Sequence, residues 1–303
     1  MRRPGAISGV PRHRRVRDLP TRTATIPEIR HDASMILDPV HPTRALPLPD
    51  SAAKTPKSLP DSDELKRLLA IELDHLTELQ AAFWADRKKA LLVVLQGRDA
   101  SGKDGTIRTV FGACNPQGCL ISSFKAPTEL EQSHDFLWRV HQVVPPRGYI
   151  GIFNRSHYED VLVVRVKELV PKQVWSRRYR QINDFEQMLS ENGVVILKFF
   201  LHISREEQRE QLLERLTDPT KNWKFRAGDL EDRALWTDYT RAYRDALRKC
   251  STKWAPWYVV PSNSTTTRNY LITRTINETL REIAPEYPRA SKKILALKSR
   301  LTE

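Results

Sequence analysis

Short apolar runs alternate along this chain with longer stretches that carry a helical pattern. Four of the runs have the length of buried strands, and they cover residues 91–95, 148–153, 194–201 and 257–260. The runs are nearly continuous rather than alternating, which is typical of strands covered on both faces. We therefore predict a sheet whose strands lie buried inside a domain.

Between these runs, apolar residues recur at the spacing of an amphipathic helix. The clearest case begins at Asp61 and Ser62, which can cap a helix, and continues through leucines from Leu65 to Leu79. Further helices are expected over residues 106–114, 129–143, 178–190, 206–216, 230–249 and 267–283. Strands that alternate with helices indicate a parallel sheet with helices on both faces, so the predicted fold class is α/β with three layers.

The first 60 residues have a different composition from the rest. They hold 10 of the 20 prolines, and 11 Lys and Arg against 5 Asp and Glu, a net charge of +6. Such a segment buries too little apolar surface to offset the entropy of ordering it. We expect a basic, disordered tail over residues 1–60, a folded domain over 61–290 and a basic tail over 291–303. Removal of residues 1–58 should then leave a folded, active protein.

The whole chain carries a net charge of +13, which favours a polyanionic partner such as nucleic acid, an anionic membrane or a phosphate polymer. Charge alone does not choose among these. The sequence has no apolar run of 18 residues, so no membrane span is expected. The three cysteines form no CxxC pair, which fits a reducing cytoplasm better than a disulfide framework.

A phosphate-binding loop follows the first predicted strand. GRDASGKD at residues 97–104 has the spacing G-x4-G-K, and it lies between a strand and a helix. Glycines let the backbone amides of such a loop point at phosphate oxygens, the helix start adds positive potential, and the lysine supplies a cation. A chance match in a surface loop is the alternative, and the flanking elements argue against it. The candidate phosphate-binding residues here are Gly97, Gly102, Lys103, Asp104, Gly105 and Thr106.

Two carboxylates in this loop call for a cation. Asp104 stands where a Ser or Thr usually binds magnesium, and Asp99 lies inside the loop. A phosphate would repel Asp99 unless a divalent cation bridged them, so Asp99 is a candidate metal ligand and catalytic residue. Asp104 serves either the site or the dipole of the helix it begins.

Polar residues also follow the second predicted strand. Ligands of open parallel sheets bind beyond the carboxyl ends of strands, so Asn154 and Arg155 should face the phosphate loop. Arg155 can clamp phosphate with two hydrogen bonds, or it can pair with Glu159 or Asp160. Asn154 can offer a metal only a neutral oxygen. His157 is interpreted as structural rather than as a phosphate-carrying nucleophile.

A basic stretch between two predicted helices is a candidate lid. Residues 215–226 hold four cations against one acidic residue, and Pro219 interrupts any helix there. We expect a lid over about residues 205–235 that closes on phosphates, with an ordinary solvated loop as the alternative. Trp223 and Phe225 are expected to anchor this loop rather than to stack on a base.

Several long motifs together resemble the second family of polyphosphate kinases. GRDASGKDGTI, FKAPT, IGIFNRSHYEDVLVVRV, DPTKNWKF and APWYVVP occur in that order between about residues 91 and 261. The chain looks like class III of that family, because classes I and II tend to carry Asp and Trp where Asn154 and His157 stand. Ser101 in place of Ala, and the Ser/Thr-rich residues 262–267, depart from the family pattern.

The resemblance implies a P-loop kinase fold like that of thymidylate kinases, with a helical lid and frequent oligomers, here a dimer or tetramer. It implies that Asp99, Lys103 and Arg155 are catalytic, that Mg²⁺ or Mn²⁺ is the cofactor, and that Asp99 and Asn154 hold the metal. The further phosphate-binding residues that we take from it and from the supply of cations are Lys125, Arg165, Arg215, Lys221 and Lys224.

The function implied is transfer of phosphate from inorganic polyphosphate to nucleotides, AMP to ADP and ADP to ATP. An ATP-dependent nucleoside monophosphate kinase and a non-catalytic polyanion-binding protein remain as alternatives. Single-strand nucleic acid binding usually relies on exposed aromatic residues at regular spacing, and the sequence has no such series. We expect no membrane partner and no specific nucleic acid partner.

Overall fold

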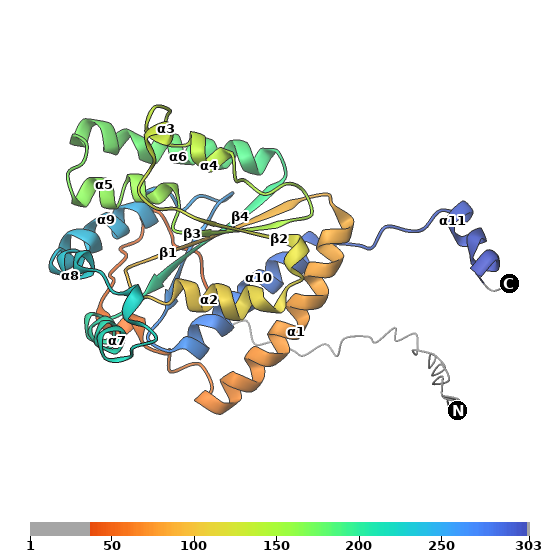
Figure 1. Ribbon diagram of the computed structural model, residues 1–303, viewed down its shortest axis with the longest axis horizontal. Helices are drawn as coiled ribbons and strands as arrows, with labels where there is room; N and C mark the ends of the chain where they lie inside the picture. Colours follow the sequence, from red (N-terminus) through yellow and green to blue (C-terminus); the bar gives the residue numbers. More distant parts are fainter. Residues whose placement is uncertain (1–36, 302–303) are drawn as a thin grey trace, which may run out of the picture. The chain divides into compact units, whose positions relative to one another are not determined.

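The computed structural model describes residues 37–301, and these residues are built around one parallel sheet (Figure 1). Its strand order is β2-β3-β1-β4-β5. The strands are β1 Ala90–Gly97, β2 Cys119–Ser123, β3 Ile150–Asn154, β4 Val194–His202 and β5 Trp257–Pro261. Four of them match the predicted apolar runs. The sequence pattern missed β2, an edge strand whose residues CLISS are all at least partly exposed and form no continuous apolar run.

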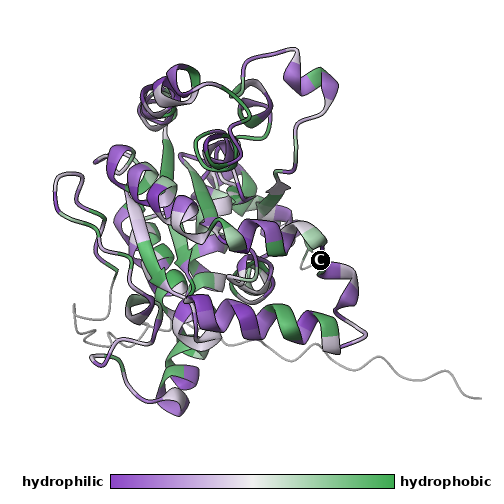
Figure 2. Ribbon diagram, turned by 90° about the vertical axis from the view of Figure 1, so that its left-hand side faces the viewer, coloured by the Kyte–Doolittle hydropathy of each residue, from purple (hydrophilic) through white to green (hydrophobic). Residues whose placement is uncertain are grey.

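Alternate residues of the central strand enter two separate cores. Leu91, Val93 and Leu95 pack with residues of α1 Ser62–Asp86, α2 Lys103–Val110 and α10 Thr265–Ile283. Leu92 and Val94 pack with residues of α6 Lys172–Glu191 and α9 Trp236–Lys249 on the other face. The sheet therefore has helices on both sides, as predicted, and Figure 2 shows hydrophobic strands between helices with polar outer faces.

The helix ends follow the local chemistry. The Asp61 carboxylate accepts hydrogen bonds from the amides of Asp63 and Glu64 and so begins α1. Residues 129–143, expected to form one helix, form α3 Glu129–Gln132 and α4 Trp138–His141 instead. The break arises because Asp135 accepts a hydrogen bond from the amide of Leu137 and starts a new turn.

Residues 230–249 were also expected to form one helix, and the structure divides them too. They belong to α8 Ala227–Ala234 and to α9, which meet at Leu235. The preceding helix, α7 Arg205–Thr217, and α8 together supply the segment expected to form the lid. Helix α5 Val163–Val166 packs on the same core as α6 and α9.

Residues 37–60 differ from the expected tail. Val40 donates its amide to the carbonyl of Trp257 at 2.7 Å, so the chain lies along the edge strand β5. The Ala53 side chain is fully buried. The carbonyl of Pro49 and the ring of His202 are 2.9 Å apart. The boundary at residue 60 is therefore wrong for this part, because prolines prevent regular structure without preventing an extended segment from packing. Residues 1–36 of the expected tail lie outside the described residues.

At the other end of the chain, the last described elements are α11 Lys292–Ala296 and a 3-10 turn over Leu297–Leu301, and all of their residues are exposed. No helix between residues 37 and 301 has the length and apolar character needed to cross a membrane.

Candidate active site

The phosphate loop joins β1 to α2, and two of its glycines leave no room for a side chain. Gly102 has a φ of 92°, and a Cβ there would lie 2.1 Å from a guanidinium nitrogen of Arg268. A Cβ on Gly97 would lie 2.8 Å from the carbonyl oxygen of Leu201 on the neighbouring strand. Both positions therefore require glycine, which accounts for the two glycines of the loop pattern.

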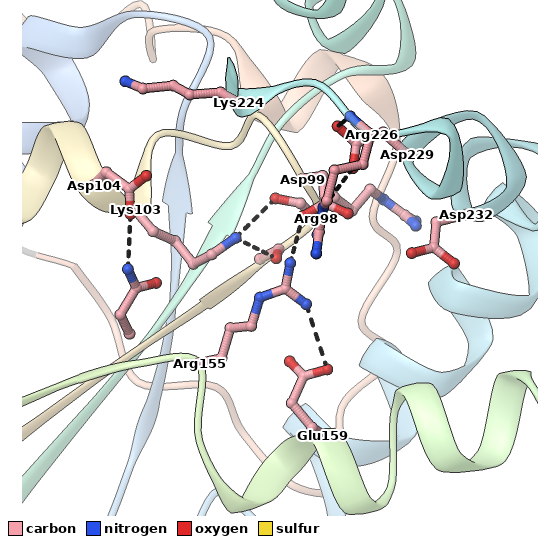
Figure 3. A network of polar contacts seen from close by, with 12 residues as sticks. Arg98, Asp99, Lys103, Asp104, Arg155, Glu159, Lys224, Arg226, Asp229 and Asp232 are labelled. Carbon is pink, nitrogen blue, oxygen red and sulfur yellow. Dashed lines mark hydrogen bonds and ion pairs between the residues drawn. The ribbon is translucent and has the colours of Figure 1, made fainter. Parts of the chain in front are cut away.

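Lys103 begins α2 and folds back over the loop (Figure 3). Its ammonium donates to the carbonyl oxygens of Gly97 at 2.9 Å and Arg98 at 3.0 Å. The side chain is buried, and burial together with the nearby Arg155 lowers the pKa of Lys103 to about 8. The cation thus lies inside the loop, where a bound phosphate chain would meet it.

Asp99 and Arg155 form the centre of the site. Arg155 is the first residue after β3, and its guanidinium donates to the Asp99 carboxylate at 2.5 Å. Burial favours the neutral acid, but the charges of Lys103 and Arg155 outweigh it, so the pKa of Asp99 lies below its ordinary value. A second guanidinium nitrogen of Arg155 lies 3.7 Å from Glu159. The pairing expected with Glu159 or Asp160 therefore involves Glu159, while Asp160 pairs with Arg178.

Asn154 and Asp104 face each other across the start of α2. The Asn154 amide nitrogen donates to an Asp104 carboxylate oxygen at 2.7 Å. Thr106, by contrast, turns to α10: its hydroxyl accepts from Arg268 and lies 3.2 Å from the Asn269 oxygen, while its amide donates to Gly102. The structure therefore places Asp104 at the site and directs the polar groups of Thr106 into the protein.

The cations expected to bind phosphate divide into two groups. Arg165 donates to Asp245 and Tyr179, and its guanidinium lies over the Trp175 ring. These contacts join α5 to α6 and α9 rather than to the phosphate loop. Of the other cations, Lys125 in the segment after β2 is exposed, whereas Arg215, Lys221 and Lys224 of the lid are partly buried.

The lid segment, defined here as residues 205–235, holds its own charges together. Arg215 pairs with Asp229 at 3.2 Å, and Lys221 pairs with Glu214. Lys224 lies 5.1 Å over the ring of Trp223, which is 77% exposed. The expectation that Trp223 anchors this loop is therefore wrong, because its ring projects from the surface.

A second polar network lies beneath the site and is fully buried. The Lys198 ammonium, on β4, donates to Glu186 at 2.5 Å and to the Tyr158 hydroxyl at 2.7 Å. The His157 ring lies 3.2 Å from the same Glu186 carboxylate and is 1% exposed. These bonds fix the turn after β3 that carries Arg155, which gives His157 a structural role.

A cavity of about 30 Å³ opens beside Asp99 and Arg155. Its walls include three residues that the sequence analysis did not single out: Arg98, Gln208 and Trp236. Arg98 occupies a variable position of the loop pattern, and the other two come from helices distant in sequence. Only the folded chain brings them together, so no local signal could have identified them.

The residues present fit a magnesium ion. No group of three or more His, Cys, Asp or Glu side chains gathers within residues 37–301. Magnesium is usually held by one or two carboxylates together with substrate phosphates, rather than by a complete protein cage. The Asp99 carboxylate, ionised at neutral pH and adjacent to the phosphate loop, meets that requirement.

A parallel sheet with a G-x4-G-K loop at the end of its central strand, and helices on both faces, defines a P-loop kinase-like α/β protein. Within that class, the chain belongs to the family described as Polyphosphate kinase 2 (PPK2), whose model matches residues 60–288. The resemblance inferred from the sequence motifs is thereby confirmed at the level of the family.

Two relatives match this chain over most of their own length. The chain is 56% identical over 230 residues to an AMP/ADP-polyphosphate phosphotransferase of Meiothermus ruber, covering 75% of this chain and 86% of the relative. It is 43% identical over 250 residues to an ADP-polyphosphate phosphotransferase of Rhodopseudomonas palustris, covering 77% and 86%. The crystal structure of polyphosphate kinase 2 from Arthrobacter aurescens TC1 matches with a TM-score of 0.80 and 41% identity, over 83% of this chain and 90% of that one.

Proposed function

We propose that this protein is a polyphosphate-dependent nucleotide kinase that transfers a phosphoryl group from inorganic polyphosphate to nucleoside mono- and diphosphates. The observation that carries the proposal is the ionised Asp99 carboxylate, paired with Arg155 and close to Lys103 in the phosphate loop. The names of the Meiothermus and Rhodopseudomonas relatives support the same donor and the same nucleotides for this chain.

In the proposed reaction, an oxygen of the acceptor's terminal phosphate attacks the terminal phosphorus of polyphosphate. The bond from that phosphorus to its bridging oxygen breaks, and the donor leaves one phosphate shorter. Phosphoryl transfer asks the protein mainly for position and charge. We assign Lys103 and Arg155 to the charge on the transferred group, and Asp99 to the placement of the acceptor and metal.

The proposed cofactor is Mg²⁺, with Mn²⁺ as a substitute. Once bound, the ion neutralises phosphate oxygens and brings donor and acceptor together. Asp99 would hold it directly. The Asn154 nitrogen donates to Asp104, so its amide oxygen is the atom that remains to offer as a second ligand.

Further phosphates of the donor require further cations. We propose that Lys125, Arg215, Lys221 and Lys224 bind them when the lid segment closes. The contacts of Arg165 with Asp245 and Tyr179 do not support the same role for that residue.

The class III resemblance suggests that one site accepts both AMP and ADP, and we adopt that proposal. The terminal phosphate of AMP and the terminal phosphate of ADP must then reach the same point, although ADP is one phosphate longer. Cations at several positions along the site allow this. Assembly into a dimer or tetramer and a location in the cytoplasm are also proposals. The three cysteines, all within the described residues and all free, favour a reducing compartment.

The test is a chromatographic time course with Mg²⁺, polyphosphate and AMP as the only nucleotide. The proposal predicts that ADP appears first and ATP second, and that both need polyphosphate. Conversion that stops at ADP would contradict the dual acceptor but retain the polyphosphate donor. If AMP gains phosphate only when ATP is supplied, an ordinary nucleotide kinase replaces the proposal.

A further inference from the structure

Two adjacent residues of the phosphate loop, Arg98 and Asp99, bond the two sides of the lid segment. Near the start of the segment, the Gln208 side-chain amide donates to the Asp99 carbonyl oxygen at 3.0 Å. Immediately after its end, Arg98 donates to the Trp236 carbonyl at 3.2 Å and to the Thr240 hydroxyl at 2.6 Å. The peptide that carries Asp99 is thus attached to α7 on one side and to α9 on the other.

Arg98 is a buried cation without an acidic partner. Its guanidinium carbon lies 3.8 Å from the centre of the Trp236 ring and 5.7 Å from that of Tyr243. Within residues 37–301, no carboxylate lies within salt-bridge distance of it, and its Nε has no hydrogen-bond partner. Desolvating a charge in this way is costly. The Trp236 carbonyl oxygen, the Thr240 hydroxyl oxygen and the face of the Trp236 ring hold the guanidinium. These contacts fix residue 98 to the start of α9.

The orientation of the Gln208 amide is determined by its second partner. Arg233 donates to the Gln208 side-chain oxygen at 2.9 Å and to the Arg205 carbonyl at 2.7 Å. A guanidinium can only donate, so the amide oxygen must face Arg233 and the amide nitrogen must face Asp99. The side chain is buried, so a rotated amide would leave polar groups unpaired.

The loop needs such support because it is strained next to Asp99. Ala100 has a φ of 66°, a left-handed conformation that costs a residue with a Cβ about 1 kcal/mol or more. Strained backbone persists where surrounding contacts determine it, and it is concentrated at functional sites. The contacts of Arg98 and Gln208 act on the two residues that precede Ala100.

We propose that Arg98 and Gln208 are positioning residues for phosphoryl transfer, which tie the Asp99 peptide to both ends of the lid segment. The Asp99 carboxylate then takes its working position only when the bases of α7 and α9 are in place. The proposal rests on the proposed function, in which Asp99 places the acceptor and metal. It gives the lid segment a second role besides supplying cations.

The first test is Gln208→Glu. This change keeps an oxygen for Arg233 but replaces the donor to Asp99 by a second acceptor. We expect kcat to fall about tenfold or more, with KM for AMP and polyphosphate within about twofold, because a small misplacement at a reacting centre is costly. Hydrogen exchange should become faster in residues 97–104 and stay unchanged in α1 and β4.

Gln211→Glu is the matched control. Gln211 lies on the same helix and bonds Glu207 on the exposed surface, so the change of charge and shape is the same without contact to the loop. Its kcat and exchange pattern should remain within about twofold of the wild type. Thr240→Val tests the other attachment, since it removes the hydroxyl that accepts from Arg98, and it should reproduce the Gln208→Glu pattern.

Asp99→Asn, measured in parallel, separates this inference from the proposed function. If the wild-type protein forms no ADP or ATP from polyphosphate, the proposed function is wrong. If it does and Asp99→Asn keeps the wild-type rate, the role given to Asp99 is wrong, and this inference fails with it. If Asp99→Asn is inactive but Gln208→Glu and Thr240→Val keep wild-type kcat and loop exchange, only the positioning role is wrong. Faster exchange throughout the sheet in both variants would also overturn it, because the two residues would then simply stabilise the fold.

Discussion

The chemistry of the site is carried by a few side chains whose charges alter one another. Lys103 and Arg155 keep Asp99 ionised, while burial makes Lys103 easier to deprotonate. A carboxylate and two cations therefore share one small volume at the ends of β1 and β3. This arrangement suits phosphoryl transfer, in which two negatively charged phosphates must come together and their charge must be neutralised by cations.

The pKa of Lys103 gives a prediction for pH dependence. Burial disfavours the charged amine, so its proton is present below about pH 8 and lost above it. We expect kcat/KM, which reports ionisation in the free enzyme, to fall on the alkaline side with an apparent pKa near 8. Lys103→Ala should be about 10²–10³-fold slower and should lack this alkaline decline. A wild-type profile that is flat up to pH 9.5, in buffers of constant ionic strength, would contradict the assignment.

At the scale of single residues, the sequence identified site residues that belong to the loop pattern or to a strand end. It identified few of the residues that pack around them. Asp99, Lys103 and Arg155 were identifiable because strand ends and loop spacing place them. Arg98 and Gln208 were not, because their roles depend on contacts between distant helices. Thr106 and Arg165 were selected by residue type and position, yet their side chains bond α10 and α9.

At the scale of elements, the central feature is the turn after β3. Arg155 has a φ of 62°, so the chain bends sharply as it leaves the strand. The buried network of Lys198, Glu186 and Tyr158 supports this turn from β4 and α6. A buried pair of this kind contributes less through attraction than through the large cost of leaving one charge alone.

That asymmetry can be measured on the Lys198–Glu186 pair. Lys198→Met takes the lysine cation from the buried Glu186 carboxylate and leaves it with His157 and the Tyr158 hydroxyl. We expect the free energy of unfolding to fall by about 3–5 kcal/mol. The double variant Lys198→Met with Glu186→Leu removes both charges and should recover a large part of that loss. Urea denaturation followed by circular dichroism provides the values. A double variant less stable than Lys198→Met alone would contradict this expectation.

The elements that the sequence predicted well are those with a long, uninterrupted pattern. Four apolar strands and the long helix α1 were of this kind, whereas β2 lies at an edge and is half exposed. The division of residues 129–143 depends on one hydrogen bond from Leu137 to Asp135, which competes with helix continuation. Periodicity does not report such local competition.

At the scale of the whole molecule, the folded domain begins before the first helix. Residues 37–60 pack along β5 and reach the start of α7, where the Asp50 carboxylate accepts a hydrogen bond from the Arg205 amide. That contact lies at the base of the lid segment. The sequence-based expectation that residues up to 58 are dispensable therefore needs revision.

We predict that a chain beginning at residue 59 unfolds at a lower temperature than one beginning at residue 37. The shorter chain loses the buried Ala53 side chain, the Pro49–His202 contact, the hydrogen bond from Val40 to β5 and the one from the Arg205 amide to Asp50. The loss should amount to about 2 kcal/mol or more, since several hydrogen bonds and a buried apolar contact disappear together. Calorimetry on the two truncated chains measures it, and equal unfolding temperatures would restore the boundary at residue 60.

The central claim is that phosphate passes directly from polyphosphate to a nucleotide under the control of Asp99 and Lys103. The most direct measurement supplies ³²P-labelled polyphosphate with unlabelled ADP and Mg²⁺, and locates the label in the ATP formed. We predict label in the terminal phosphate of ATP from the first turnover, at a rate that Asp99→Asn lowers about 10²-fold or more. ATP that forms without label would contradict the claim, because its phosphate would then have come from a second molecule of ADP.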